Sequence, residues 1–467
     1  MSRRIAIILT VLLCVVSFGT WQLWNRRDPA ARLDPNAKID PKKVFSLVVW
    51  VEVGTGVGEP PDQDAPFWQD IRGSLQQMYP NVESTFVFVN TSELTQAMEE
   101  SLAKGRPPHI LVESRSWFST WSTLQLPIDR FLPVQPEEIY LHSALARVAV
   151  KEGVMAWPCV IEPNLWVSSR QVWDALKDDA AVVNEQLADA STWIGSQWQN
   201  LQGVFQQAKL PGPVVSLQES DKSSLLHVLI AASGGIIDTE GELLLTEELI
   251  ETAFNAYKAQ QTAKFSVQIQ GTLLTDFLTE QRGIIGPCGL WLASLDENAK
   301  LRGYDKVNIA TDLRWMPPSG GRGSGSHLQG KMTQISVFRH KRFQGLAYAR
   351  LSMELAQMLS QRLGWARSRD FQGLPADKRL WEKWQNEHDI DDEVWASLMD
   401  ALAGPLGLSP LPVRWHNLRY TVIQDILEPF IEDFVNGLDC SPADAIATIG
   451  SFLKVSQGKV GKSRINQ

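Results

Sequence analysis

The sequence predicts an α/β protein built from two lobes, and two observations support this prediction. First, residues 45–133 alternate between short β-branched or aromatic runs and stretches with helical spacing. Such alternation is typical of a parallel sheet covered by helices. Second, the chain has 467 residues, about three times a ~150-residue domain, so more than one lobe is expected. The hydrophobic content of 44% and charged content of 21% are those of an ordinary globular protein.

Five elements follow one another at the start of the body. Residues 45–51 (Phe-Ser-Leu-Val-Val-Trp-Val) suit a strand that is buried on both faces. Residues 68–78 carry apolar side chains at helical spacing, and Tyr79-Pro80 ends this helix. The pattern continues with a strand over residues 82–89, a helix over 94–103 and a strand over 109–113.

Polar residues and glycines follow the first and third of these strands. The ligand crevice of a parallel sheet lies beyond the carboxyl ends of its strands. We therefore expect ligand-binding residues at these ends, which carry Glu52, Gly54, Thr55, Glu113, Ser114, Arg115 and Trp117.

Composition and motif spacing argue against several classes of function. The net charge of −9 is unfavourable for a protein whose main partner is nucleic acid or anionic lipid. The seven histidines include no His-Glu-x-x-His pair, and the four cysteines include no Cys-x-x-Cys pair. No Gly-x-Ser-x-Gly elbow follows a strand. We therefore expect no catalysis, no metal and no cofactor.

The N-terminus is expected to carry an export signal or a membrane anchor. Residues 5–24 contain no charged side chain and lie between Arg3-Arg4 and Arg26-Arg27, and ~20 apolar residues are enough to span a bilayer. A cleaved signal peptide and a retained anchor both fit, and the interfacial Trp21 and Trp24 favour the anchor. In either case the body is expected to be extracytoplasmic, in the periplasm or on the outer face of the cytoplasmic membrane, and either tethered or secreted.

Short motifs along the body resemble, in order, those of one protein family. They are Tyr79-Pro-Asn-Val-Glu83, Gly105-Arg-Pro-Pro-His-Ile-Leu111, Leu132-Pro133, Met155-Ala-Trp-Pro158, Gly234-Gly235 with Asp238 and Gly241, Pro317-Pro-Ser-Gly-Gly321 and Ser441-Pro-Ala-Asp-Ala-Ile446. This set is similar to motifs of the extracellular solute-binding proteins of ABC transporters (family 1), the group that contains maltose-binding protein.

The resemblance implies a two-lobe periplasmic-binding-protein fold (type II), in which each lobe is a mostly parallel sheet flanked by helices and hinge strands join the lobes. The predicted organisation is an N-terminal signal or anchor helix over residues 1–27, a linker over 28–44, lobe I over 45–163 with 332–394, lobe II over 164–331 with 395–455, and a flexible tail over 456–467.

The same resemblance implies a function without catalysis. A monomer would capture a solute, with a sugar or oligosaccharide favoured, in the cleft between its lobes, and hinge closure would trap it. It would then deliver the solute to the permease subunits of an ABC importer. No nucleic acid is expected among its partners. Matching positions give the ligand-binding residues Glu52, Gly54, Thr55, Glu113, Arg115, Glu162, Trp291 and Trp415.

Several alternatives stay open from the sequence. An interlobe salt bridge accounts for Glu162 as well as ligand binding does, and packing accounts equally well for Trp415. The chain could also be a ligand-sensing or interaction protein that keeps the fold without transport. A secreted glycan hydrolase would need two carboxylates flanking a bond, for which Glu113 and Glu162 are candidates.

Overall fold

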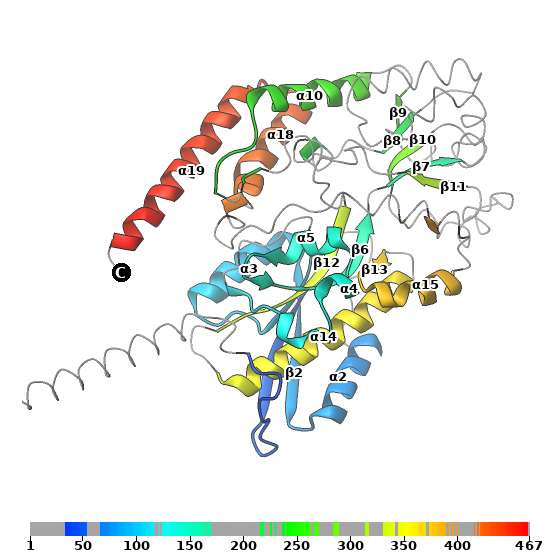
Figure 1. Ribbon diagram of the computed structural model, residues 1–467, viewed down its shortest axis with the longest axis vertical. Coiled ribbons are helices and arrows are strands. Elements are labelled where there is room, and N and C mark those ends of the chain that lie inside the picture. The colour runs from blue at the N-terminus through cyan, green and yellow to red at the C-terminus, as the bar shows by residue number, and fades with distance from the viewer. Residues whose placement is uncertain are drawn as a thin grey trace, which may run out of the picture. The chain divides into compact units, whose positions relative to one another are not determined.

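The computed structural model describes most of two α/β units (Figure 1). The described residues are 33–53, 66–115, 124–163, 165–169, 215–218, 236–238, 240–262, 266–269, 284–288, 313–316, 330–340, 344–369, 373–388 and 421–465, with isolated positions such as Trp121 and Trp415. The N-terminal stretch expected to be an anchor lies outside these residues. Among the helices that the structure does describe, none is both long and apolar enough to cross a membrane.

The chain divides into two compact units. Unit 1 comprises residues 1–112, 124–133 and 335–358, and unit 2 comprises 113–123, 134–334 and 359–467. In sequence, the boundaries fall within β3 (Ile110–Arg115), β12 (Gly330–Val337) and α14 (Leu346–Arg369). The lobe boundaries given by the sequence stay a prediction.

The first sheet has six strands in the order β13-β6-β12-β3-β1-β2. Its remaining strands are β1 (Phe45–Val53), β2 (Val82–Asn90), β6 (Trp157–Pro163) and β13 (Leu374–Pro375). Strand β1 runs parallel to both β2 and β3, which confirms the parallel β-α-β-α-β start. The helices of this start are α2 (Pro66–Met78) and α3 (Thr91–Ala103).

The core of unit 1 follows from the apolar spacing of these elements. Leu47 and Val49 of β1 are fully buried, and Trp68, Ile71 and Leu75 of α2 are buried with them. The expectation that β1 is buried on both faces is wrong for its first half, where Ser46 is exposed and Val48 and Trp50 are half-buried. Only the last three residues of β1 are all buried.

The residues before β1 pack against unit 1 from Leu33 onwards. Leu33 is 1% exposed, and its carbonyl accepts a hydrogen bond of 2.9 Å from Nη1 of Arg130. The carbonyl of Ala37 accepts a hydrogen bond of 2.8 Å from Nη1 of Arg350. These contacts fix residues 33–44, which the sequence assigns to a linker, as part of the unit.

A second sheet, within unit 2, has five strands in the order β11-β7-β10-β8-β9. They are β7 (Leu165–Ser169), β8 (Val215–Gln218), β9 (Ser266–Ile269), β10 (Ile284–Cys288) and β11 (Leu313–Met316). Strands β10, β8 and β9 are mutually parallel, whereas β7 runs antiparallel to both β10 and β11. The sheet is therefore parallel in the half formed by β10, β8 and β9 and antiparallel in the half that contains β7 and β11.

Helices near the C-terminus form a separate apolar cluster in unit 2. Helices α10 (Glu247–Thr262), α18 (Glu428–Val435) and α19 (Pro442–Ile465), with the π-helix η7 (Val422–Leu427), bury residues such as Ile250, Ile431 and Ile449. Helix α19 continues to Ile465 and so includes most of the residues that the sequence assigns to a flexible tail.

The remaining elements are short. They are the hairpin β4 (Ala149–Val150) and β5 (Gly153–Val154), the helices α4 (Pro136–Ile139), α5 (His142–Val148) and α15 (Trp381–Glu387), and the 3-10 turns η3 (Asp129–Phe131) and η6 (Lys378–Leu380).

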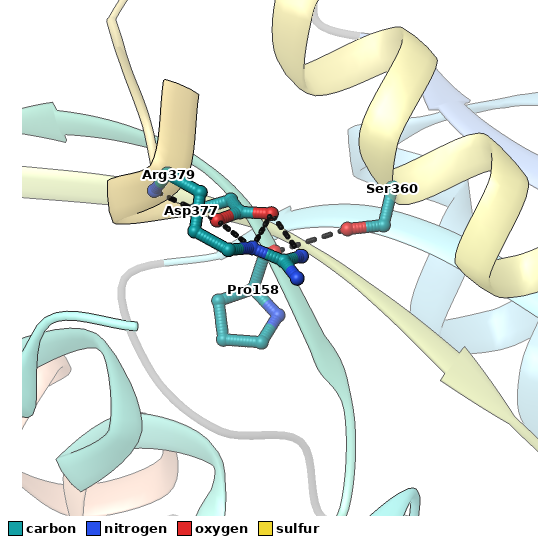
Figure 2. A network of polar contacts seen from close by, with 4 residues as sticks. All are labelled: Pro158, Ser360, Asp377 and Arg379. Carbon is teal, nitrogen blue, oxygen red and sulfur yellow. Dashed lines mark hydrogen bonds and ion pairs between the residues drawn. The ribbon is translucent and has the colours of Figure 1, made fainter. Parts of the chain in front are cut away.

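Helix α14 is joined to the edge of the first sheet by a hydrogen bond within unit 2. Figure 2 shows the Ser360 hydroxyl of α14 directed at β6, where it donates to the carbonyl of Pro158 at 3.1 Å. The carboxylate of Asp377 accepts from the backbone N–H of Arg379 at 3.0 Å and so caps η6. Its second oxygen accepts from Nη2 of Arg379 at 2.6 Å (Figure 2). These bonds hold the short strand β13 and the helix after it in place.

Candidate functional site

Five polar residues of unit 2 gather where β3 ends. We call them the carboxyl-edge cluster: Glu113, Ser114, Thr333, Gln334 and Arg367. They come from β3, β12 and the last turn of α14. The cluster therefore lies at the end of the sheet where a parallel α/β fold binds its ligand.

The strand directions explain why these residues meet. The N–H of Phe338, just after β12, donates to the carbonyl of His109, just before β3. At the other end of both strands, the hydroxyls of Ser114 and Thr333 lie 2.7 Å apart. Strand β12 therefore runs antiparallel to β3, and its first residues lie opposite the last residues of β3.

One half of the cluster is a buried carboxylate with a neutral partner. Glu113 is 0% exposed, and Nε2 of Gln334 donates to its Oε1 at 3.0 Å. A carboxylate removed from water must be hydrogen-bonded, because burial alone disfavours it strongly. This bond fixes the Glu113 side chain in one orientation.

The other half of the cluster is a cation held by hydroxyls. Nη1 of Arg367 donates to Oγ1 of Thr333 at 2.7 Å and to Oγ of Ser114 at 3.3 Å. Successive residues of a strand point to opposite faces, so Ser114 and Glu113 lie on different faces of β3. The edge thus holds a fully buried carboxylate on one face and a half-buried guanidinium on the other, and charged groups of this kind make strong hydrogen bonds to polar partners.

The structure describes five of the eight ligand-binding residues expected from the sequence. Glu52 is 6% exposed in β1, Glu113 is fully buried in β3, and Glu162 is half-buried in β6. Arg115 is the last residue of β3, and its side chain is not described. Gly54, Thr55 and Trp291 lie outside the described residues.

The fifth, Trp415, is packed inside unit 2. It is 6% exposed. Its ring lies so close to Gly241 that a Cβ placed there would come within 2.7 Å of the indole. Of the two readings that the sequence leaves open for Trp415, this contact favours packing.

Three residues of the cluster were not expected from the sequence. Thr333 and Gln334 lie within the buried strand β12 and are 0% and 2% exposed. Two adjacent polar residues in such a strand are a usable signal, because buried polar side chains need partners. Arg367 has no such signal, since it is one of several arginines near the end of α14.

The described residues offer little for metal or thiol chemistry. Among them, no group of three or more His, Cys, Asp or Glu side chains could hold a metal ion. Burial raises the pKa of the Cys159 thiol to about 12, which keeps it protonated and unreactive at neutral pH.

A cavity in unit 1 lies at the opposite end of β3. It is partly open to solvent and is lined by His109, His340, Gln344 and Tyr348, among others. The imidazole rings of His109 and His340 are 4.3 Å apart between centroids. The backbone N–H of Val48 donates to Nδ1 of His109 at 3.1 Å, so the other ring nitrogen carries the proton and donates to Oε1 of Gln344 at 2.9 Å.

This histidine pair is expected to make the stability of unit 1 depend on pH. Burial lowers the pKa of His109, and burial together with the charge of His109 lowers the pKa of His340 to about 4. In the unfolded chain the histidine pKa values are near ~6.5. Between pH ~6.5 and about 4, the unfolded chain therefore binds more protons than the folded one. Stability is therefore fully present above pH ~6.5 and is lost as the pH falls towards 4. Urea unfolding midpoints between pH 4 and 8 measure this loss.

The variant His340→Gln removes part of this dependence and should flatten the profile between pH 4 and 6.5. His142→Gln is the matched control, because His142 is exposed and should leave the profile unchanged. A profile that His340→Gln leaves as steep as the wild type would contradict the assignment.

Comparisons with known proteins identify the fold. No family model matches the chain, and no curated protein matches it. Solved structures do match over nearly their whole length. The GacH receptor of Streptomyces glaucescens is 14% identical with a TM-score of 0.53, and the match covers 88% of this chain and 99% of that one. An ABC substrate-binding protein from Listeria monocytogenes, in complex with cycloalternan, is 12% identical with a TM-score of 0.54, covering 90% and 100%.

The sugar-binding protein MalE from Xanthomonas citri is similar to the same degree, at 12% identity and a TM-score of 0.55, covering 90% of this chain and 98% of that one. This likeness confirms the predicted fold class, the two-lobe periplasmic-binding-protein fold (type II). At such low identity it bears on the fold and not on the ligand.

Proposed function

We propose that this protein is an extracytoplasmic solute-binding protein that captures a carbohydrate and delivers it to an ABC importer. The observation that carries this proposal is the carboxyl-edge cluster, in which a fully buried, oriented Glu113 lies at the strand end where this fold binds ligands. Proteins of the same fold are described as bound to cycloalternan, maltose or maltotriose, and extending that ligand class to this chain is part of the proposal.

The chemistry of the predicted residues suits a sugar. Carboxylates such as Glu52, Glu113 and Glu162 accept hydrogen bonds from hydroxyl groups, and Arg115 donates them. The indole of Trp291 would stack on the C–H face of a sugar ring. Gly54 and Thr55 would let the backbone approach the ligand. Trp415 is the weakest member of this set, because its packing against Gly241 already accounts for its position.

The cellular setting belongs to the same proposal. The apolar residues 5–24 would serve as a membrane anchor or a cleaved signal. The partners would be the permease subunits of the importer, and the protein would act as a monomer. Ligand capture would be reversible and without chemical conversion, since closure requires only a higher affinity of the closed form.

Titration of the intrinsic tryptophan fluorescence tests this function. We expect a saturable change with at least one member of a panel of oligosaccharides, and none with amino acids or polyamines. Recovery of the sugar unchanged after incubation separates binding from hydrolysis. A lack of response to every solute would favour an interaction protein of the same fold, and release of shortened products would favour a glycan hydrolase.

A further inference from the structure

Arg367 is a cation whose partners are all neutral. It is half-buried, and its hydrogen bonds go from Nη1 to the hydroxyls of Thr333 at 2.7 Å and Ser114 at 3.3 Å. No carboxylate among the described residues pairs with it. Removing an arginine from bulk water without a counter-charge is costly. Within the part of the chain that the structure describes, no acid therefore neutralises this charge at the carboxyl edge.

Two other arginines, the half-buried Arg350 and the exposed Arg379, show the usual arrangement, in which a carboxylate pairs with the guanidinium. Nε of Arg350 lies 2.8 Å from Oε1 of Glu354, and Nη2 of Arg379 lies 2.6 Å from Oδ2 of Asp377 (Figure 2). In both cases a carboxylate within the same segment neutralises the guanidinium. Arg367 differs from them in having hydroxyls where they have acids.

The neighbours of Arg367 do not supply the missing charge. Glu113 is adjacent to Ser114 in β3, so its side chain points to the opposite face of the sheet and is bonded to Gln334. Cys159 is close enough for Arg367 to influence its thiol, but burial keeps the pKa of that thiol at about 12, so the sulfur is neutral.

The geometry of Arg367 leaves part of its guanidinium available. Nη1 is held by the two hydroxyls, whereas Nε and Nη2 make no hydrogen bond to a described residue and are not among the fully buried unsatisfied atoms. These two nitrogens form one edge of the guanidinium fork. Such an edge binds both oxygens of a carboxylate at once.

We propose that Arg367 receives a carboxylate of the ligand, so that the solute is an acidic carbohydrate such as a uronic-acid oligosaccharide. This inference rests on the proposed function and specifies its ligand class. The hydroxyls of Ser114 and Thr333 orient the guanidinium without neutralising it. A neutral sugar would leave the charge of Arg367 without a counter-ion and would bind more weakly.

Calorimetric titration of the full-length protein with trigalacturonate, a glucuronate-containing trisaccharide and neutral maltotriose tests this proposal. We expect at least one of the acidic sugars to bind more than tenfold tighter than maltotriose. Arg367→Gln should weaken that sugar by roughly 10- to 100-fold, the range of a lost charge-assisted pair. It should leave maltotriose affinity within about twofold. Raising the salt concentration should weaken the acidic sugar alone.

Arg369→Gln is the matched control, because it removes the same charge from an exposed position of the same helix. It should leave all three affinities nearly unchanged. Arg367→Lys retains the charge without the fork and should recover part of the affinity, which separates charge loss from misfolding.

Two outcomes would overturn the proposal, and they are distinguishable. If maltotriose binds as tightly as both acidic sugars, or if Arg367→Gln behaves like Arg369→Gln, the carboxylate assignment is wrong while the solute-binding function stands. If no oligosaccharide binds in either assay, the function itself fails, and the inference fails with it.

Discussion

Replacing Trp68 by alanine is expected to lower the free energy of unfolding by about 3–5 kcal/mol, the range for removing a buried large aromatic side chain. Trp68 lies on the buried face of α2 and is 4% exposed. Its ring centroid is 5.2 Å from that of Phe86 and 5.4 Å from that of Phe88, both in β2. The change therefore empties the contact between the first helix and the edge strand. Urea unfolding followed by circular dichroism measures the loss.

Met78→Ala in the same helix is the control for this prediction. Met78 is 54% exposed, so its truncation should change stability by less than about 0.5 kcal/mol. Equal losses for the two variants would mean that α2 does not depend on packing against β2.

Local pattern was enough to predict the beginning of the fold. The strand of residues 45–51 and the helix of residues 68–78 appear as Phe45–Val53 and Pro66–Met78. The helix has apolar side chains at the helical period, the strand is a nearly continuous β-branched and aromatic run, and turn residues stop both. Burial was less predictable. Val48 and Trp50 lie on the second face of β1 and are only half-buried, because burial depends on which elements pack there.

The candidate site was predictable only in part, for a similar reason. Glu113 could be located from sequence because a polar residue that ends a buried strand of a parallel sheet marks the ligand edge. The other residues could not be located in this way. The partners of Thr333 and Gln334 are more than two hundred residues away in the sequence. Arg367 reaches the cluster only because α14 is 24 residues long and ends there. Contacts between such distant segments leave no periodic signal in the chain.

Asp238 and Gly241, which belong to one of the motifs that resemble the solute-binding family, have a structural role in this chain. Asp238 accepts hydrogen bonds from the backbone N–H groups of Glu240 and Glu242 at 2.8 and 2.9 Å, and these bonds lower the pKa of the carboxyl. The turn that they close requires Gly241 to adopt φ +94°, a conformation that other residues adopt only with strain. The Asp238–Gly241 spacing thus encodes a tight turn that receives the ring of Trp415.

Gly241→Ala is expected to destabilise unit 2 by roughly 2–5 kcal/mol, since it combines two penalties. The left-handed backbone costs about 1–2 kcal/mol for a residue with a Cβ. The new methyl group also overlaps the Trp415 indole at 2.7 Å, and overpacking typically costs about 1–3 kcal/mol. Thermal and urea unfolding measure the sum.

Gly437→Ala separates the two penalties. Gly437 has φ +75°, and nothing lies within 4 Å of its missing Cβ, so this variant should show the backbone cost alone. The difference between the variants then measures how firmly Trp415 is held. In a Trp415→Ala background, where the indole is gone, Gly241→Ala should cost only the backbone part. If Gly241→Ala costs no more stability than Gly437→Ala, the indole of Trp415 moves aside freely. Such mobility is expected of a tryptophan that stacks on a sugar, and Trp415 would then be a candidate ligand-binding residue again.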